Sequence, residues 1–311
     1  MPELLVEAIT AVHRYGNMSA AAVALKIPRA TLQGRYYRAI AEGIGQPLER
    51  SNWTYPQQIE IELRAATVLI GGDAHFWPGQ HPLIYQAFVD VAAYLKPKAI
   101  VLNGDMFDGT RVGRHGRLRG QSAPRVKDEL NATSEKLAML VGAEHQFFTI
   151  GNHDQRVDMY MANAAPEMDD AVMSLADYFP NWQMCWAVTI NGHTEIRHRF
   201  RSGIHARHNN TIHSGRNIFT NHTHQLGITP FDDRNGRRWG GETGMLNWPD
   251  APQFEYTEGA PTRWAPGFMV LTFDSDGNLL PPETCEWVHG RAWFRGASWG
   301  LGKPRVWASG K

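Results

Sequence analysis

The strongest constraint on this sequence is a recurring pattern in which a short apolar run ends in Gly, Asn, Asp and His. Gly151-Asn152-His153-Asp154 is the clearest example, because it directly follows the apolar run at residues 146–150. Such a run is typical of a buried strand, and the polar residues then lie on the loop that leaves its carboxyl end. Three similar clusters occur elsewhere: Gly72-Asp73-Ala74-His75, Asn103-Gly104-Asp105-Met106-Phe107-Asp108 and Asn221-His222-Thr223-His224. A fold that brings these ends together would concentrate carboxylate, amide and imidazole groups in one place.

The segments between these clusters alternate between strand and helix patterns. Apolar runs at residues 67–70, 99–102 and 146–150 predict strands, and helical periodicity at residues 84–95 and 126–141 predicts helices between them. This β-α-β-α-β order implies parallel strands with right-handed crossovers, whose carboxyl edges open on one crevice. Later segments are strand-like, at residues 186–190, 195–200, 217–220 and 268–273. A second sheet facing the first predicts an α/β fold, an αββα two-sheet sandwich.

Length and composition place the chain among ordinary globular proteins. Its 31 acidic residues balance 31 Lys and Arg residues, so the net charge favours no particular partner. The cysteines Cys185 and Cys285 show no CxxC spacing, which is typical of a reducing compartment. The amino-terminal residues lack the basic and apolar regions of a signal peptide, and no run of about 18 apolar residues occurs. We therefore expect a cytoplasmic protein without a membrane span.

The amino-terminal segment has a different, entirely helical pattern. Three helices are predicted, at residues 5–12, 20–25 and 29–42, and Pro28 disfavours helical geometry just before the third. Residues 18–40 have the order of a short helix, a brief turn and a longer helix, and therefore resemble the helix-turn-helix family of DNA-binding domains. The expected organisation is a small all-α helix-turn-helix-like domain, a linker and an α/β domain, at residues 1–45, 46–64 and 65–311.

The third helix of this module would present polar side chains outward: Arg29, Thr31, Gln33, Arg35 and Arg38. Side chains of these types suit phosphates and base edges, so the resemblance implies DNA as a partner. Helix-turn-helix modules commonly work in pairs, which suggests a homodimer. Residues 1–45 carry five Lys and Arg against three Glu, a small excess, so a three-helix cap or a protein-docking module is the alternative.

The polar clusters at the strand ends have the composition of a metal site. Asp, His and Asn supply oxygen and nitrogen donors that suit Mn, Fe, Ni or Zn rather than Ca. Asp105 can bridge two cations through its two oxygens. Two cations about 3.5–4 Å apart would hold the attacking and leaving oxygens of a phosphoryl group. The sequence therefore favours two divalent transition-metal ions, with Mn first among them.

The motifs D-x-H, G-D-x-x-D, G-N-H-D and H-T-H occur in this order over residues 67–225 and resemble the calcineurin-like metallophosphoesterase family. The resemblance implies the following ligands: Asp73, His75 and His224 for one cation, Asn152, His222 and an intermediate histidine for the other, and Asp105 between them. It also implies that a hydroxide bridging the metals attacks phosphorus. His153 would then protonate the leaving oxygen, and Asp154 would orient His153.

Two positions depart from the family pattern. Asn221 stands where the family usually has Gly, so its side chain either crowds the turn or adopts the left-handed conformation that Asn tolerates. The intermediate histidine is either His198 or His205. His198 is favoured because it shares a predicted strand face with Ile196, whereas His205 lies in a glycine-containing loop and would instead contact phosphate.

Basic residues follow the second motif and surround the intermediate histidines. The expected substrate-binding residues are Arg111, Arg114, His115, His205 and Arg207. Such residues near a phosphate site suit a polyanionic backbone, although solvated loops have similar compositions. The leading hypothesis is a phosphodiesterase or nuclease acting on DNA. The sequence also looks like those of phage proteins. The alternatives are a phosphoesterase for a small nucleotide or cyclic nucleotide, and a DNA-binding regulator without catalysis.

Overall fold

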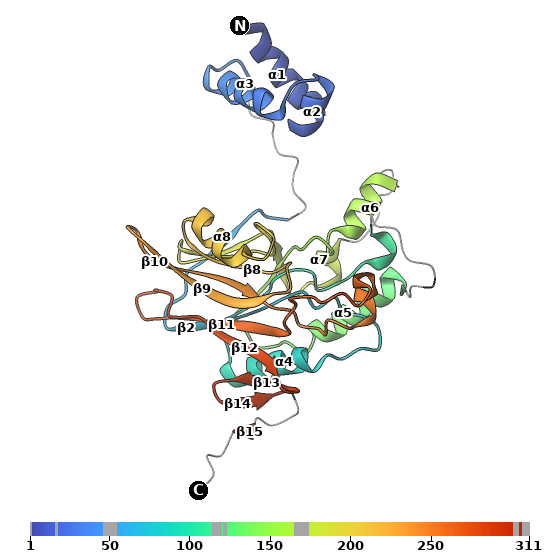
Figure 1. Cartoon of the computed structure of the whole chain (residues 1–311), viewed down its shortest axis with the longest axis vertical. Coiled ribbons are helices and arrows are strands. Elements are labelled where there is room, and N and C mark those ends of the chain that lie inside the picture. Colours follow the sequence, from blue (N-terminus) through green and yellow to red (C-terminus); the bar gives the residue numbers. More distant parts are fainter. Residues whose placement is uncertain are drawn as a thin grey trace. The chain divides into compact units, whose positions relative to one another are not determined.

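The computed structural model describes residues 2–15, 18–45, 55–113, 120, 123–164, 174–300 and 305–306 (Figure 1). The chain divides into two compact units, Met1–Thr54 and Tyr55–Lys311. Within the described ranges, none of the helices combines the length and apolar character needed to cross a bilayer.

Unit 1 is built from three helices, α1 (Pro2–Tyr15), α2 (Met18–Ala24) and α3 (Arg29–Ala41). Pro28 directly precedes α3 with φ −58°, the value that its ring imposes, and with an extended ψ of 139°. The helices share one apolar core formed by Ala8, Ala11, Val12, Ala21, Ala22, Leu32 and Tyr36. The three predicted helices are therefore present, and their binding to DNA stays a prediction.

Unit 2 contains a nine-stranded sheet whose order is β15-β14-β13-β12-β11-β2-β3-β4-β5. Its parallel part consists of β2 (Ala66–Gly71), β3 (Ala99–Leu102), β4 (His145–Thr149) and β5 (Gln183–Cys185). Its antiparallel part consists of β11 (Gly267–Phe273), β12 (Glu283–Val288), β13 (Arg291–Phe294), β14 (Ala297–Trp299) and β15 (Arg305–Val306). The predicted β-α-β-α-β order is confirmed.

A second, six-stranded sheet has the order β1-β6-β7-β8-β10-β9. Its strands are β1 (Ile59–Ile61), β6 (Val188–Ile190), β7 (Thr194–Ile196), β8 (Asn217–Thr220), β9 (Leu226–Asp233) and β10 (Gly236–Thr243). The structure corrects the predicted linker at residues 46–64 here, because β1 pairs in parallel with β6. Residues 46–54 lie outside the described ranges.

Helices flank the two sheets. They are α4 (Leu83–Leu95), α5 (Val126–Leu137), α6 (Arg156–Ala164), α7 (Leu175–Tyr178) and α8 (Ala206–Ser214), with 3-10 turns η1 (Thr110–Val112) and η3 (Pro252–Thr257). Helix α4 contacts β2, β13 and β14, whereas α8 contacts β8, β9 and β10. The described elements therefore form the mixed α/β, two-sheet arrangement expected from the sequence.

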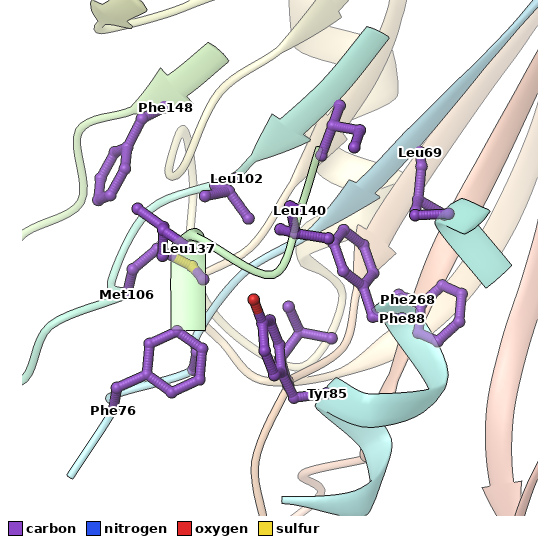
Figure 2. Packing of buried hydrophobic residues seen from close by; sticks show 14 of the residues in the cluster. Leu69, Phe76, Tyr85, Phe88, Leu102, Met106, Leu137, Leu140, Phe148 and Phe268 are labelled. Carbon is purple, nitrogen blue, oxygen red and sulfur yellow. The ribbon is translucent and has the colours of Figure 1, made fainter. Parts of the chain in front are cut away.

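The central strands are apolar on both faces because each face packs against a different layer. Leu69 points into a helix-side core with Tyr85 and Phe88 of α4, whereas its neighbours Val68 and Ile70 point into an inter-sheet core. Figure 2 shows the helix-side packing, in which the rings of Phe88 and Phe268 meet edge to face at 5.2 Å between centroids. Burial on both faces holds the strand ends, and hence the polar clusters, in fixed register.

Phe88→Ala should lower the free energy of unfolding by about 3–5 kcal/mol, because it leaves a cavity in the helix-side core. Val141→Ala is the control, since Val141 is 79% exposed and its truncation should change stability by less than about 0.5 kcal/mol. Urea unfolding followed by circular dichroism measures both changes. Equal effects of the two substitutions would contradict the packing described for Phe88.

Candidate metal centre

The pairing of β2 with β3 continues beyond the strands into the polar loops. Asn103 donates its backbone N–H to the Gly71 carbonyl (2.7 Å), and the Asp73 N–H donates to Gly104 (2.9 Å). The N–H of His75 donates in turn to the carbonyl of Asp105 (2.9 Å). Because the two loops run side by side, Asp73, His75 and Asp105 are held against one another although they come from distant segments.

Five residues of these loops have a left-handed backbone, which side-chain-bearing residues rarely adopt. Their φ angles lie between 42° and 75°, at Asp73, His75, Asp105, His222 and His224. Each such residue costs on the order of 1–3 kcal/mol and persists only where the surrounding structure holds it. All five are predicted metal ligands, so the backbone strain is concentrated where the sequence places the site.

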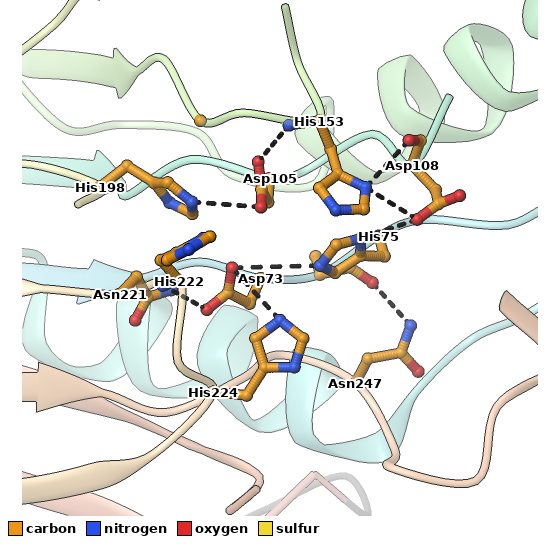
Figure 3. A network of polar contacts seen from close by, with 12 residues as sticks. Asp73, His75, Asp105, Asp108, His153, His198, Asn221, His222, His224 and Asn247 are labelled. Atoms are coloured by element: carbon orange, nitrogen blue, oxygen red, sulfur yellow. Dashed lines mark hydrogen bonds and ion pairs between the residues drawn. The ribbon is translucent and has the colours of Figure 1, made fainter. Parts of the chain in front are cut away.

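The side chains form three overlapping groups that offer metal-ligand atoms within 4.8 Å of one another. The groups are Asp73 with His75 and His224, His75 with Asp105 and His153, and Asp105 with His198 and His222 (Figure 3). Nε2 of His198 lies 3.1 Å from Oδ2 of Asp105, and Nε2 of His224 lies 3.6 Å from Oδ1 of Asp73. Asp105 belongs to two groups, as expected of a residue between two cations. His75 also belongs to two, because it groups with His153, which the sequence predicted as the general acid and not as a ligand.

Several buried ligand atoms of this cluster make no hydrogen bond. They are Asp73 Oδ1, His75 Nε2, Asn152 Oδ1 and His198 Nε2. Nδ1 of His198 donates to the Asn103 carbonyl (2.8 Å), which leaves Nε2 directed at Asp105 as the atom that would bind a cation. Each unsatisfied buried atom costs about 1–3 kcal/mol, and bound divalent cations would satisfy all four. The residues therefore fit a metal site.

Burial and neighbouring charges shift the pKa values of the cluster in both directions. Burial raises the pKa of Asp73 well above its usual value, whereas at His198 burial is more than offset by the carboxylate of Asp105, which raises the pKa to about 9, so a cation would have to displace the proton of His198. Burial lowers the pKa of His75 and His224, and burial with the charge of His198 lowers the pKa of His222 to about 4. Burial opposes ionisation of Asp105, but the neighbouring His198 and His153 more than offset it and hold its pKa well below the usual value. Neutral imidazole and ionised carboxylate are the forms that bind metal.

A family model for calcineurin-like phosphoesterases matches residues 66–266, which include every predicted metal ligand. The chain belongs to the calcineurin-like phosphoesterase family. Membership supports metal-dependent hydrolysis of a phosphoester, as the resemblance implied.

Individual relatives are distant. The Gene 54 protein of Mycobacterium phage D29 is 26% identical over 246 residues, covering 69% of this chain and 91% of that protein. The Gene 54 protein of Mycobacterium phage L5 is 27% identical over 168 residues, covering 48% of this chain and 64% of that protein. The solved structure of wild-type Vps29 from Entamoeba histolytica complexed with Zn is 14% identical, with a TM-score of 0.38, and covers 73% of this chain and 96% of that one.

The phosphoesterase places His198, and not His205, in the cluster. His198 lies two residues beyond β7, so the predicted strand at residues 195–200 is wrong in its second half. It still reaches the centre because its backbone carbonyl accepts the N–H of Asn221 (2.7 Å) and its imidazole is bound to the Asn103 carbonyl. His205 is exposed and immediately precedes α8.

Asn221 neither crowds the turn nor takes the left-handed conformation. The positive φ falls on His222, the next residue, and Asn221 is not among the described residues with positive φ. Its side chain lies where a Cβ on Gly72 would stand, and its Oδ1 accepts a hydrogen bond from the hydroxyl of Thr243. The absence of a side chain at Gly72 therefore leaves the space that the side chain of Asn221 occupies.

The expected contact between Asp154 and His153 is wrong. The Asp154 carboxylate is fully buried and accepts backbone N–H groups, from Asp105 (2.7 Å) and Gly151 (2.8 Å) among others. Asp108 takes the expected role, because its Oδ1 accepts Nδ1 of His153 (3.0 Å) and Nδ1 of His75 (2.9 Å). The spacing of G-D-x-x-D shows that Asp108 follows Asp105 on the same loop, but not which imidazole it would meet.

Arg156, at the start of α6, is a site residue that the sequence did not indicate. Its Nη1 donates to the Asp108 carbonyl (2.7 Å), and its Nη2 lies 3.0 Å from Nε2 of His153. Its position two residues after the G-N-H-D motif is the signal that would have found it. The guanidinium is partly exposed beside the predicted general acid, which is where a phosphate oxygen would need a positive charge.

The predicted substrate-binding residues do not form a cluster like that of the predicted metal ligands. Arg111 is exposed on η1 and its Nε donates to the Ala123 carbonyl (2.9 Å). Arg207 is half-buried in α8. Arg114 and His115 lie outside the described residues. Of the described histidines, His205 joins none of the three ligand groups.

Glu129 of α5 supports the loop that carries Asp108. Its Oε2 accepts the backbone N–H of Gly109 (2.6 Å), and the side chain is buried. Burial, together with the charge of Asp108, raises the pKa of Glu129 to about 8.

Gly104→Ala should weaken metal binding at least about tenfold, because a Cβ there would overlap the imidazole of His198. Gly79→Ala is the matched control, since its φ of 77° resembles the 79° of Gly104 while its Cβ would meet nothing within 4 Å. Both substitutions carry the cost of a left-handed alanine, about 1–2 kcal/mol, so only the overlap differs. Calorimetric titration with Mn separates them, and equal affinities in the two variants would contradict this account.

Glu129 should make the protein less stable as the pH rises from about 5 to 8. In this window the folded protein keeps a proton on Glu129 that the unfolded chain has released, so the free energy of unfolding falls with pH, by at most about 1.4 kcal/mol per unit. Glu129→Gln keeps an oxygen for Gly109 and should lose this dependence. Urea titrations across the window compare the two proteins, and parallel pH profiles would count against the shifted pKa.

Proposed function

We propose that this protein is a two-metal phosphodiesterase that hydrolyses DNA. The observation that carries the proposal is the cluster of three overlapping ligand groups, with buried lone pairs that no hydrogen bond satisfies. Membership of a phosphoesterase family is consistent with it.

The residues divide between two cations that share one carboxylate. Asp73, His75 and His224 would hold one cation, and Asn152, His198 and His222 the other, with Asp105 between them. When bound, the pair would supply Lewis acidity that activates water and neutralises charge on the phosphoryl oxygens. Mn is the first candidate, and Fe, Ni or Zn are compatible with the same nitrogen and oxygen donors.

His153 is placed to act as the general acid. Its Nδ1 is hydrogen-bonded to the carbonyl and to Oδ1 of Asp108, both at 3.0 Å, which fixes the ring. Nε2 accepts from Arg156 in this arrangement, so acting as the acid requires that Nε2 take up a proton and turn from the guanidinium to the leaving oxygen. Arg156 lies at Nε2, where its guanidinium can bind a non-bridging phosphate oxygen. Asp108 would thus orient the acid, and Arg156 would bring the leaving oxygen towards it.

DNA is the proposed substrate because unit 1 presents a polar face on α3. Arg29, Thr31, Gln33 and Arg38 are exposed, whereas Arg35 is partly covered and lies 4.0 Å from Glu7. Arg38 is paired with Glu42 (2.7 Å), an exposed contact that DNA phosphates can replace at little cost. These side chains suit the backbone-positioning contacts that carry most affinity for DNA, in a monomer or in a homodimer.

Asp105→Asn should lower DNA cleavage in Mn by at least about 100-fold and reduce bound metal, since one ligand then loses its charge. The fold should persist because the amide oxygen can still accept the N–H of His153, now 2.7 Å from Oδ1. Asp232→Asn removes an exposed carboxylate paired with Arg237 and is the isosteric control. Metal content, melting temperature and cleavage of linear, circular and single-stranded DNA are measured on all three proteins.

Undiminished DNA cleavage by Asp105→Asn would overturn the mechanism. Hydrolysis of a small nucleotide or cyclic nucleotide without DNA cleavage would instead select the small-substrate enzyme. Salt-dependent DNA binding without hydrolysis in Mn would select the non-catalytic regulator.

A further inference from the structure

The segment that joins β10 to β11, residues 244–266, is bound directly to the loops of the metal centre. The Leu246 N–H donates to the carbonyl of Gly72 (3.0 Å), and Gln253 Nε2 donates to that of His75 (2.8 Å). The Ala265 N–H donates to the carbonyl of His224 (2.9 Å). The segment therefore follows the backbone of two predicted ligands and forms one wall of the site.

Aromatic rings of this segment contact the ligand imidazoles. The ring of Phe254 is 5.1 Å from that of His75 and 5.7 Å from that of His224, and Trp264 lies 4.3 Å from His224. Such edge-to-face contacts favour one ring orientation over others. Packing on the imidazoles therefore explains why an aromatic side chain stands at position 254, where Phe254 is 1% exposed. The same packing explains the buried part of the Trp264 side chain.

Tyr256 extends the same aromatic group but is not used in packing on the imidazoles. Its ring lies 6.4 Å from those of both Phe254 and Trp264, and the residue is 52% exposed. Burial of the phenol, and then the charge of Asp108, raise its pKa to about 12, so the hydroxyl stays neutral. Through its contacts with Phe254 and Trp264, this exposed ring adjoins the aromatic side chains that pack on His75 and His224.

We propose that Tyr256, backed by Trp264, is a stacking site for the base of the nucleotide whose phosphate lies at the metal centre. In a nucleotide, the sugar links a planar base to the phosphate and keeps the two a short distance apart. An aromatic side chain can stack on any base. The neutral hydroxyl of Tyr256 can also donate to a phosphate or sugar oxygen. The inference rests on the proposed function, because it assigns a nucleotide to the same site.

The test compares two probes that differ only in the base, thymidine 5′-monophosphate and 2-deoxyribose 5-phosphate, by calorimetry on the full chain loaded with Mn. The wild type should bind the nucleotide about tenfold more tightly than the sugar phosphate, within the range measured for one stacked base. Tyr256→Ala should abolish this difference, and Tyr256→Phe should retain most of it. Tyr94→Ala is the matched control, because Tyr94 is 60% exposed and contacts Trp299.

Equal binding of the two probes by the wild type would overturn the stacking site. So would a Tyr256→Ala variant that keeps the tenfold preference or loses affinity for both probes alike. The proposed function fails separately: if the wild type shows the base-dependent difference but hydrolyses no phosphodiester, the stacking site stands and the DNA phosphodiesterase does not.

Discussion

The geometry of the metal centre depends on one buried carboxylate that binds backbone instead of metal. Asp154 accepts the N–H groups of Asp105 and Gly151, and also those of Met106 (3.2 Å) and Phe107 (3.4 Å). These groups belong to the loops after β3 and β4, which no strand pairing holds together at this point. Because a buried N–H without a partner is costly, the two loops keep their relative position as long as Asp154 is present. The positions of the predicted ligands Asp105 and Asn152 therefore depend on the hydrogen bonds of Asp154.

Close approach of these loops requires glycine where they touch. A Cβ on Gly151 would overlap the carboxylate of Asp105, and one on Gly104 would overlap His198. The space released by the missing side chains is occupied by Asp105 and His198, of which Asp105 has a left-handed backbone. The glycines of the G-D and G-N-H-D motifs are therefore needed for the fit of the site, beyond any role as turn formers.

One wall of the metal centre is formed by a segment that follows the four motifs in the sequence. Residues 244–266 close one side with backbone hydrogen bonds and aromatic rings, while Asp108 and Arg156 form the side of the predicted general acid. The two sides differ in chemistry, one apolar and flat, the other charged.

The central parallel strands, most helices and the set of clustered ligands could be predicted because they depend on local patterns, whereas β1, β5, β9, β10 and β12–β15 were not predicted. Burial on both faces makes β3 and most of β2 apolar, and parallel order brings the carboxyl ends of β2, β3 and β4 to one edge. The partner of His153 could not be predicted, since Asp108 and Asp154 are both carboxylates in the same motifs. Which one turns to the imidazole is decided by the N–H groups that surround Asp154.

The sequence by itself determined the parallel order of the central strands, the identity of the polar groups at their ends and the relation to metal-dependent phosphoesterases. Only the tertiary structure decided between His198 and His205, placed Arg156 against His153 and packed Phe254 and Trp264 on the imidazoles of His75 and His224. The physical reason is that residue type and spacing specify which strand end a side chain leaves from. Its direction is set by backbone hydrogen bonds and packing with segments distant in the chain.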